Sequence, residues 1–183
     1  MSPDLHAMIL GAWQTNNRTS TTFIEQIPVQ LWAAGIPALP HRSVRMIAAH
    51  LHNARRRWIR TLGSESGVPV PERVDERGVT RRQLVTALNR SSRGIEAILR
   101  LALDAGGTLP APKLYTWRNL PLDAGHILTY FVAHEAHHRG QIVMAARQMG
   151  QRLPRGATDG LWQWTTRVRE LKGKASGRTQ PRS

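Results

Sequence analysis

Apolar residues recur at the spacing of an α-helix in four long segments, and this pattern constrains the fold more than any other feature. The four segments cover residues 4–27, 42–62, 80–104 and 121–149. Ser43 and Thr80 stand where a side-chain oxygen can accept a hydrogen bond from the first turn of a helix. Stretches rich in proline and glycine separate the segments, and none alternates as a strand does. The sequence therefore predicts an all-α fold, a four-helix bundle with long loops.

The end of the chain differs in composition from the four segments. A short C-terminal helix is predicted at 160–172, and glycine, serine, proline and basic residues dominate the stretch that follows. A chain of 183 residues has the length of one domain with an extension. We therefore expect a helical bundle domain over 1–172 and a flexible, disordered basic tail over 173–183.

The chain contains no cysteine, which limits the chemistry open to it. Disulfides, thiolate zinc sites, iron–sulfur clusters and a cysteine nucleophile are excluded. Any metal ion must be held by nitrogen and oxygen ligands.

The formal net charge is +14, and nearly all of the basic residues are arginines. Clusters at Arg55–Arg57 and Arg81–Arg82 suit phosphates, which leaves nucleic-acid binding open. No known nucleic-acid-binding signature supports that function, so it is not favoured. The chain shows no signal peptide and no apolar run long enough for a membrane span. We expect a soluble, cytoplasmic protein without a membrane partner.

Two histidines of the fourth segment stand at the spacing of a metal-binding pair. His134 and His138 are four residues apart, so their side chains lie about 40° apart around a helix and can reach one ion. Ile127, Phe131 and Ile142 share or flank that side of the helix, so the pair is expected to face the bundle interior. The alternative is a pair of core or surface histidines without a metal.

A third ligand would come from the second segment, which offers His50 and His52. His50 lies at the edge of the apolar face, whereas His52 lies about 200° further round, among arginines on the expected solvated side. We predict a site of His50, His134 and His138 that binds a divalent ion, zinc or nickel. Three protein ligands leave coordination positions open, as in catalytic rather than structural sites. A hydrogen-bonded core histidine is the alternative role for His50.

Other residues near the predicted site are candidates for supporting roles. Gln141 shares the face of His138, one turn further on, and could bond a water or substrate. His137 flanks the pair, as a supporting or an exposed residue, and Arg57 and Arg139 are candidates for holding a substrate carboxylate. Glu135 points about 100° away from His134, which argues against a zincin-like peptidase.

The segments around these histidines resemble the DinB/YfiT-like family of metal-dependent proteins. The sequence AHEAHHRGQI at 133–142 is similar to the hallmark segment of the family's fourth helix, and AHLHNARRRW at 49–58 is similar to its second-helix histidine segment. The resemblance implies a bundle with up-down-down-up helices, a metal site whose ligands match His50, His134 and His138, and often a homodimer. Relatives include thiol S-transferases that use bacillithiol or mycothiol, and a mycothiol-dependent maleylpyruvate isomerase.

Several functions are compatible with these features. The favoured one is a metal-dependent enzyme that acts on a small-molecule substrate, a low-molecular-weight thiol or an electrophile, as an S-transferase does. A hydrolase is a close variant. The alternatives are a metal-binding bundle without catalysis and a nucleic-acid-binding bundle.

Overall fold

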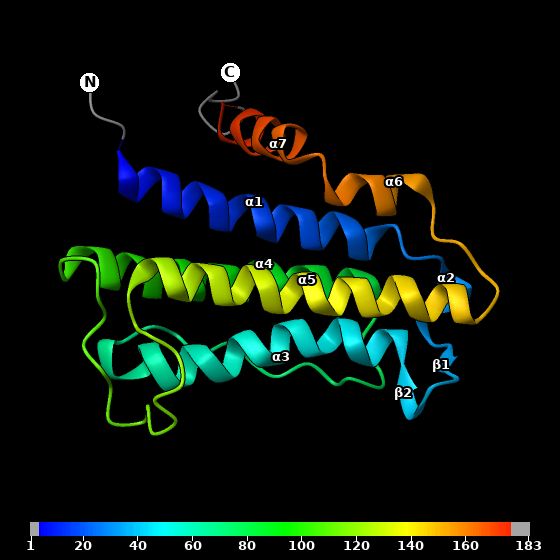
Figure 1. Ribbon diagram of the computed structural model, residues 1–183, viewed down its shortest axis with the longest axis horizontal. Helices are drawn as coiled ribbons and strands as arrows, with labels where there is room; N and C mark the ends of the chain where they lie inside the picture. Colours follow the sequence, from blue (N-terminus) through cyan, green and yellow to red (C-terminus); the bar gives the residue numbers. More distant parts are fainter. Residues whose placement is uncertain (1–3, 177–183) are drawn as a thin grey trace, which may run out of the picture.

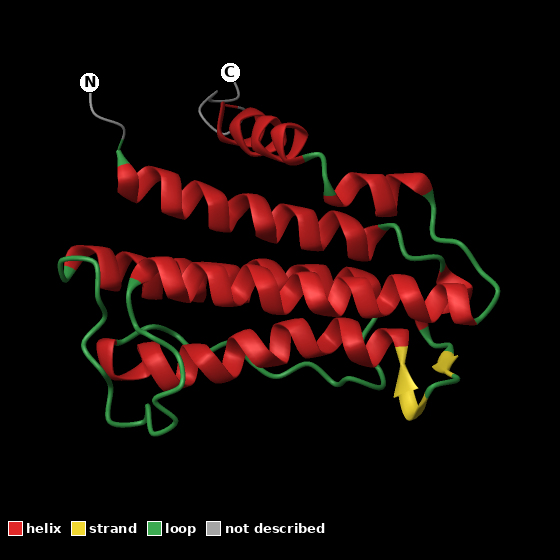
Figure 2. Cartoon of the chain, in the orientation of Figure 1, coloured by secondary structure: helices red, strands yellow, loops and turns green. Residues whose placement is uncertain are grey.

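The computed structural model describes residues 4–176, and its fold is mostly helical (Figures 1 and 2). The four long helices are α1 (Leu5–Glu25), α3 (Val44–Gly63), α4 (Arg81–Asp104) and α5 (Ala124–Gln148). They match the four predicted segments, which confirms the all-α class. Within the described residues, no helix combines the length and apolar character needed to cross a membrane.

The four long helices lie side by side, and each contacts two or more of the others. Both α4 and α5 pack against α1 and α3. Figure 1 shows α1 and α5 running in one direction and α3 and α4 in the opposite one. The N-terminal half of α3, which holds His50, therefore lies beside the middle and the C-terminal half of α5, and His134 and His138 stand near that middle.

The helix starts follow the side chains that cap them. The Ser43 hydroxyl accepts a hydrogen bond from the Met46 N–H, and the Thr80 side chain accepts one from the Gln83 N–H, so both residues are the predicted N-caps. Thr80 and Gln83 also form a reciprocal capping box. The fourth predicted segment begins later than expected, at Ala124 rather than at 121. The reason is Asp123, whose carboxylate accepts the His126 N–H and makes Asp123 the N-cap.

A small antiparallel hairpin corrects the expectation that the chain has no strands. It consists of β1 (Gly35–Ile36) and β2 (Leu39–Ser43), follows the short helix α2 (Val29–Trp32), and leads directly into α3 (Figure 2). Gly35 pairs with Ser43 and Ile36 with Leu39, so the three residues 40–42 bulge out without cross-strand partners. Prolines in this stretch favour extended backbone, and the sequence analysis took them only as a connection.

The C-terminal part differs from its prediction at both ends. A short helix α6 (Arg155–Thr158) and a 3₁₀ turn η2 (Asp159–Leu161) precede the last helix, α7 (Trp164–Ser176). The tail expected from residue 173 thus begins inside α7, and its remainder, 177–183, lies outside the described residues. A second 3₁₀ turn, η1 (Ser64–Ser66), begins the predicted loop at 64–79.

Candidate metal centre

The three predicted histidines come together between α3 and α5. His50 projects from α3, and His134 and His138 project from successive turns of α5. One possible ligand nitrogen from each lies within 4.8 Å of the other two. The His138 ring centroid lies 4.6 Å from that of His50 and 4.5 Å from that of His134. The structure therefore gathers the three imidazoles that the sequence analysis selected.

The spacing of the two α5 imidazoles fits a shared divalent ion. The Nε2 atoms of His134 and His138 are 3.2 Å apart. A tetrahedral ion held about 2.0–2.1 Å from each nitrogen would separate two such nitrogens by about 3.3 Å. Three nitrogen donors and no sulfur donor suit zinc, nickel and similar divalent ions.

Gln141 fixes the orientation of one imidazole. Its side-chain carbonyl Oε1 lies 2.7 Å from His138 Nδ1 and accepts the Nδ1–H. That bond leaves the lone pair on His138 Nε2, the atom that faces His134. A hydrogen bond of this kind sets the tautomer and orientation of a metal-binding histidine. The sequence analysis placed Gln141 near a bound water or substrate, and the structure places its oxygen on His138.

The surroundings of the three histidines lower their pKa values and so favour the neutral imidazole. Burial, followed by the neighbouring positive charge of His138, lowers the pKa of His50 to about 4. The same two causes lower the pKa of His134 to about 4. Burial also lowers the pKa of His138. Neutral imidazoles have the free lone pair that a metal ion requires.

A small cavity of about 230 Å³ opens onto two of the histidines. It lies between β2, α3 and α5. Its walls are Leu39, Arg42, Ile47, His50, His138 and Gln141. A molecule in this space would touch two of the three imidazoles and would reach solvent past the hairpin.

The other two predicted supporting residues lie outside this cavity. His137 is exposed, and its ring centroid is 5.1 Å from that of His138. Arg57 is also exposed, and its positive charge contributes to the lowered pKa of His50. Neither is among the residues that line the cavity.

A buried ion-pair network lies next to the histidines. It was not predicted from the sequence. The Glu135 carboxylate is wholly buried and accepts hydrogen bonds from Arg55 Nε at 2.6 Å, Asn16 Nδ2 at 2.9 Å and Ser20 Oγ at 2.8 Å. Arg139 Nη1 lies 3.7 Å from the same carboxylate and donates to Ser20 Oγ. The network therefore joins α1, α3 and α5.

This network corrects two expectations about arginines. Arg139 was a candidate for holding a substrate carboxylate, but its side chain is buried against α1. Arg55 was counted among phosphate-binding residues, but its side chain is 1% exposed and paired with Glu135. The available sequence signal was Asn16, a polar residue in helical register with apolar residues of the first helix such as Ile9 and Phe23.

The Glu135 carboxylate stays ionised in this setting. Burial alone would raise its pKa, but the charge and hydrogen bond of Arg55 and the charge of Arg139 outweigh that effect and lower the pKa. The buried polar residues of the four long helices together form a polar layer. On each of these helices they stand between members of one apolar cluster and members of the other, so the layer divides the apolar interior in two. It lies at the level of α5 from which His134 and His138 project.

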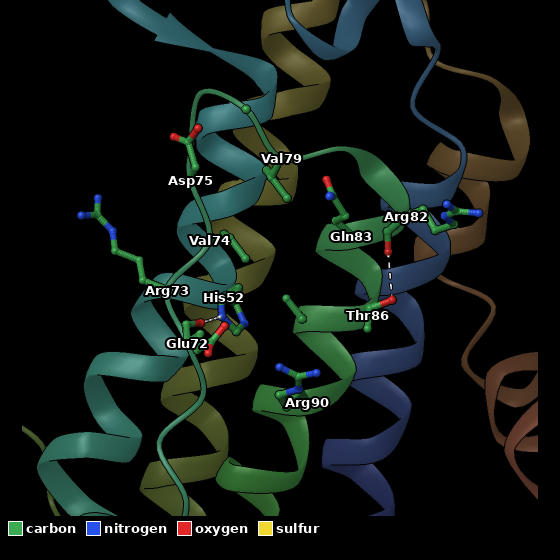
Figure 3. A pocket seen from close by; sticks show the side chains of 12 residues that line it. His52, Glu72, Arg73, Val74, Asp75, Val79, Arg82, Gln83, Thr86 and Arg90 are labelled. Atoms are coloured by element: carbon green, nitrogen blue, oxygen red, sulfur yellow. Dashed lines mark hydrogen bonds between the residues drawn. The ribbon is translucent and has the colours of Figure 1, made fainter.

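His52 occupies a different site from the one predicted for it. It is 1% exposed, and its Nε2–H donates to the Glu72 carbonyl at 2.8 Å (Figure 3). Its Nδ1 lies 3.1 Å from Ser91 Oγ. The loop 64–79 covers this face of α3, which helical periodicity alone treated as solvated. His52 borders a larger cavity of about 560 Å³ between the loop and α4.

Comparison with known proteins identifies the family of the chain. The model of the DinB family matches residues 1–171, nearly the whole described chain. The comparison with curated proteins found no match. The resemblance seen in the two histidine segments thus extends over the domain, and the chain belongs to the DinB family.

Proposed function

We propose that this protein binds one divalent metal ion through His50, His134 and His138 and acts as a metal-dependent enzyme on a small thiol, as S-transferases do. The observation that carries the proposal is the convergence of three neutral imidazoles beside a cavity. We further propose that the four long helices form the up-down-down-up bundle that the family resemblance implies. The homodimer and the cytoplasmic location stay predictions.

Zinc and nickel are the metals we propose for this centre. Imidazole nitrogen suits both, and the set lacks the carboxylates that favour magnesium or calcium. With three protein ligands, the centre would keep at least one coordination position for a substrate. The cavity beside His50 and His138 supports this reading, because it provides room for that substrate.

The chemistry proposed for the site is activation of a thiol. When bound, a divalent ion lowers the pKa of a thiol coordinated to it, so that the sulfur is a nucleophilic thiolate. Gln141 keeps the lone pair of His138 Nε2 directed at the centre. Leu39 and Ile47 give the cavity apolar walls, which limit access of water to the sulfur.

A conjugation assay tests the enzymatic part of the proposal. Zinc-loaded protein is mixed with monochlorobimane and, in turn, cysteine, glutathione, bacillithiol and mycothiol. In the expected reaction the thiolate attacks the chloromethyl carbon, a C–S bond forms, chloride leaves as the C–Cl bond breaks, and the thiol proton passes to solvent. With at least one thiol, fluorescence should rise faster than in buffer, and His138→Ala should abolish the gain while His137→Ala keeps it.

The same assay separates catalysis from metal binding. Protein that holds one ion per chain but leaves all four rates at the buffer value would contradict the S-transferase function. The metal-binding bundle without catalysis would then be the better description. Loss of metal from His138→Ala in that experiment would still support the histidine centre.

A further inference from the structure

We propose that Arg42, on the bulge of the β-hairpin, binds the carboxylate of a small acid whose other end occupies the metal centre. This inference rests on the proposed metal-binding function. It names the class of molecule that the cavity accepts: a short organic acid with a metal-binding donor atom. Arg42 is the residue that would select this class.

Arg42 is the one charged residue among those that line the cavity. It shares the cavity with His50, His138 and Gln141. Among the described residues, no carboxylate lines the space, so a bound anion would meet attraction from Arg42 and from the ion.

The guanidinium of Arg42 is free to bind a ligand. Within the described residues, the arginines that form ion pairs are Arg18, Arg55, Arg73, Arg100, Arg139 and Arg167, and Arg42 has no acidic partner. The residue is also exposed, and it lines the cavity. Arginine presents paired N–H groups that match the two oxygens of a carboxylate.

The hairpin backbone carries an irregularity that places Arg42 at the cavity. Residues 40–42 have no cross-strand partners, and His41 has a φ of 67°, which a non-glycine residue rarely adopts. Such a conformation costs free energy, and bulges commonly re-aim a side chain next to a functional site. A regular two-stranded ladder would not need this strained residue before Arg42.

The size and the walls of the cavity restrict the acid. A volume of about 230 Å³ corresponds to roughly eight water molecules at ~30 Å³ each. Leu39 and Ile47 supply apolar contact for a short carbon chain between the two ends of the ligand. A molecule with a thiol, one or two methylenes and a carboxylate matches these features.

Two probes that differ only at one end test the proposal. 3-Mercaptopropionate carries a thiol and a carboxylate, and 2-mercaptoethanol carries the same thiol with a hydroxyl. Each is titrated into protein loaded with Co²⁺, and the sulfur-to-cobalt charge-transfer absorption gives the dissociation constant. Wild-type protein is compared with Arg42→Gln and with Arg77→Gln, which removes an exposed arginine that lies outside this cavity.

The expected result is a selective loss of affinity for the acid. A charge-assisted hydrogen-bonding pair corresponds to about tenfold to hundredfold in affinity. Arg42→Gln should weaken 3-mercaptopropionate by that factor, leave 2-mercaptoethanol unchanged, and match wild type in cobalt content. Arg77→Gln should bind both probes like wild type.

Three outcomes would overturn the inference. The first is that wild-type protein binds the acid no more tightly than 2-mercaptoethanol. The second is that Arg42→Gln weakens the binding of both probes equally. The third is that Arg77→Gln weakens the binding of 3-mercaptopropionate as much as Arg42→Gln does, which would indicate an effect of the general positive charge only. Each of these, with one cobalt ion per chain, contradicts the role of Arg42 and leaves the metal centre intact. Absence of stoichiometric cobalt would contradict the proposed function itself, and this inference with it.

Discussion

Arg55 on α3 and Glu135 on α5 form a wholly internal ion pair, with Nε and Oε1 2.6 Å apart and side-chain exposures of 1% and 0%. His134 is the residue next to Glu135 in the chain, so the pair holds α5 at the level where the histidines meet α3. The Arg55 guanidinium also lies 4.7 Å from the centroid of the Trp13 ring. The packing of α1, α3 and α5 around this pair thus positions the candidate metal centre.

Glu135→Gln should be strongly destabilising. The substitution keeps the shape of the side chain but leaves the buried Arg55 charge unpaired, which costs about 3–5 kcal/mol. The free energy of unfolding in urea measures this loss. The matched control is Glu96→Gln, which breaks the pair with Arg100, whose side chain is 56% exposed, and should cost under about 1 kcal/mol. Equal losses for the two variants would contradict the central role of the buried pair.

His52→Ala should lower the free energy of unfolding without loss of the metal ion. It leaves the Glu72 carbonyl and Ser91 hydroxyl without their imidazole partner, so the free energy of unfolding should fall by about 1–3 kcal/mol. The folded protein should keep its metal content, because His52 faces the loop 64–79 and is not part of the triad. His137→Ala, at an exposed position, should change neither quantity. Metal loss in folded His52→Ala would show that the triad has the wrong member from α3.

Gly94→Ala should destabilise the contact between α3 and α4. A β-carbon at Gly94 would lie 2.6 Å from Ile59 Cδ1 and 3.0 Å from its Cγ1. Overpacking costs about 1–3 kcal/mol, which exceeds the ~1 kcal/mol gained when alanine replaces glycine in a helix. Ile59→Val removes Cδ1, the closest atom. The double variant should therefore lose less stability than the sum of the losses of Gly94→Ala and Ile59→Val alone.

Gly140→Ala on α5 is the control for Gly94→Ala, because it measures the gain in helix propensity without the steric clash. A β-carbon there meets nothing within 4 Å, so the substitution should stabilise the protein by up to ~1 kcal/mol. Thermal or urea unfolding of the two single variants gives the comparison. Stabilisation by Gly94→Ala would mean that Ile59 moves aside at little cost.

Asp123→Ala should weaken the start of α5 in a pH-dependent way. The cap is worth about 1 kcal/mol, and the hydrogen bond from the His126 N–H lowers the pKa of Asp123 below its ordinary 3.8. A carboxyl whose pKa is lower in the folded than in the unfolded state stabilises the protein fully at pH values above its unfolded-state pKa. This contribution is lost as the pH falls through the folded-state pKa. The stability gap between wild type and variant should therefore narrow on acidification. A gap that widens would contradict this sign.

Helix periodicity and capping residues predicted most of the fold. Ser43 and Thr80 cap the helices expected of them, and the histidines of the triad were selected by their angular positions alone. Threonine is a poor helix former in isolation, yet Thr15 and Thr19 of α1 are helical, and their hydroxyls donate to carbonyls four residues earlier. Hydroxyls bonded in this way stay within the helix and do not draw the backbone into a turn.

The remaining features depend on contacts between distant segments, which periodicity does not contain. His52 is buried only because the loop 64–79 folds back over α3, and Arg55 is buried only because Glu135 comes from another helix. The Arg42 bulge depends on strand pairing within a proline-rich connection. His52 and Arg55 have the polarity or charge of surface residues, so an argument from one helix at a time assigns them to solvent.

Metal content by elemental analysis tests the central claim most directly. Untagged protein, reconstituted with zinc and with nickel, is measured beside His50→Ala, His134→Ala and His138→Ala, with circular dichroism to confirm folding. The account predicts about one ion per chain in wild type and in His137→Ala, and loss of the ion from each triad variant while the helices persist. Wild-type protein without stoichiometric metal, or triad variants that keep it, would contradict the account.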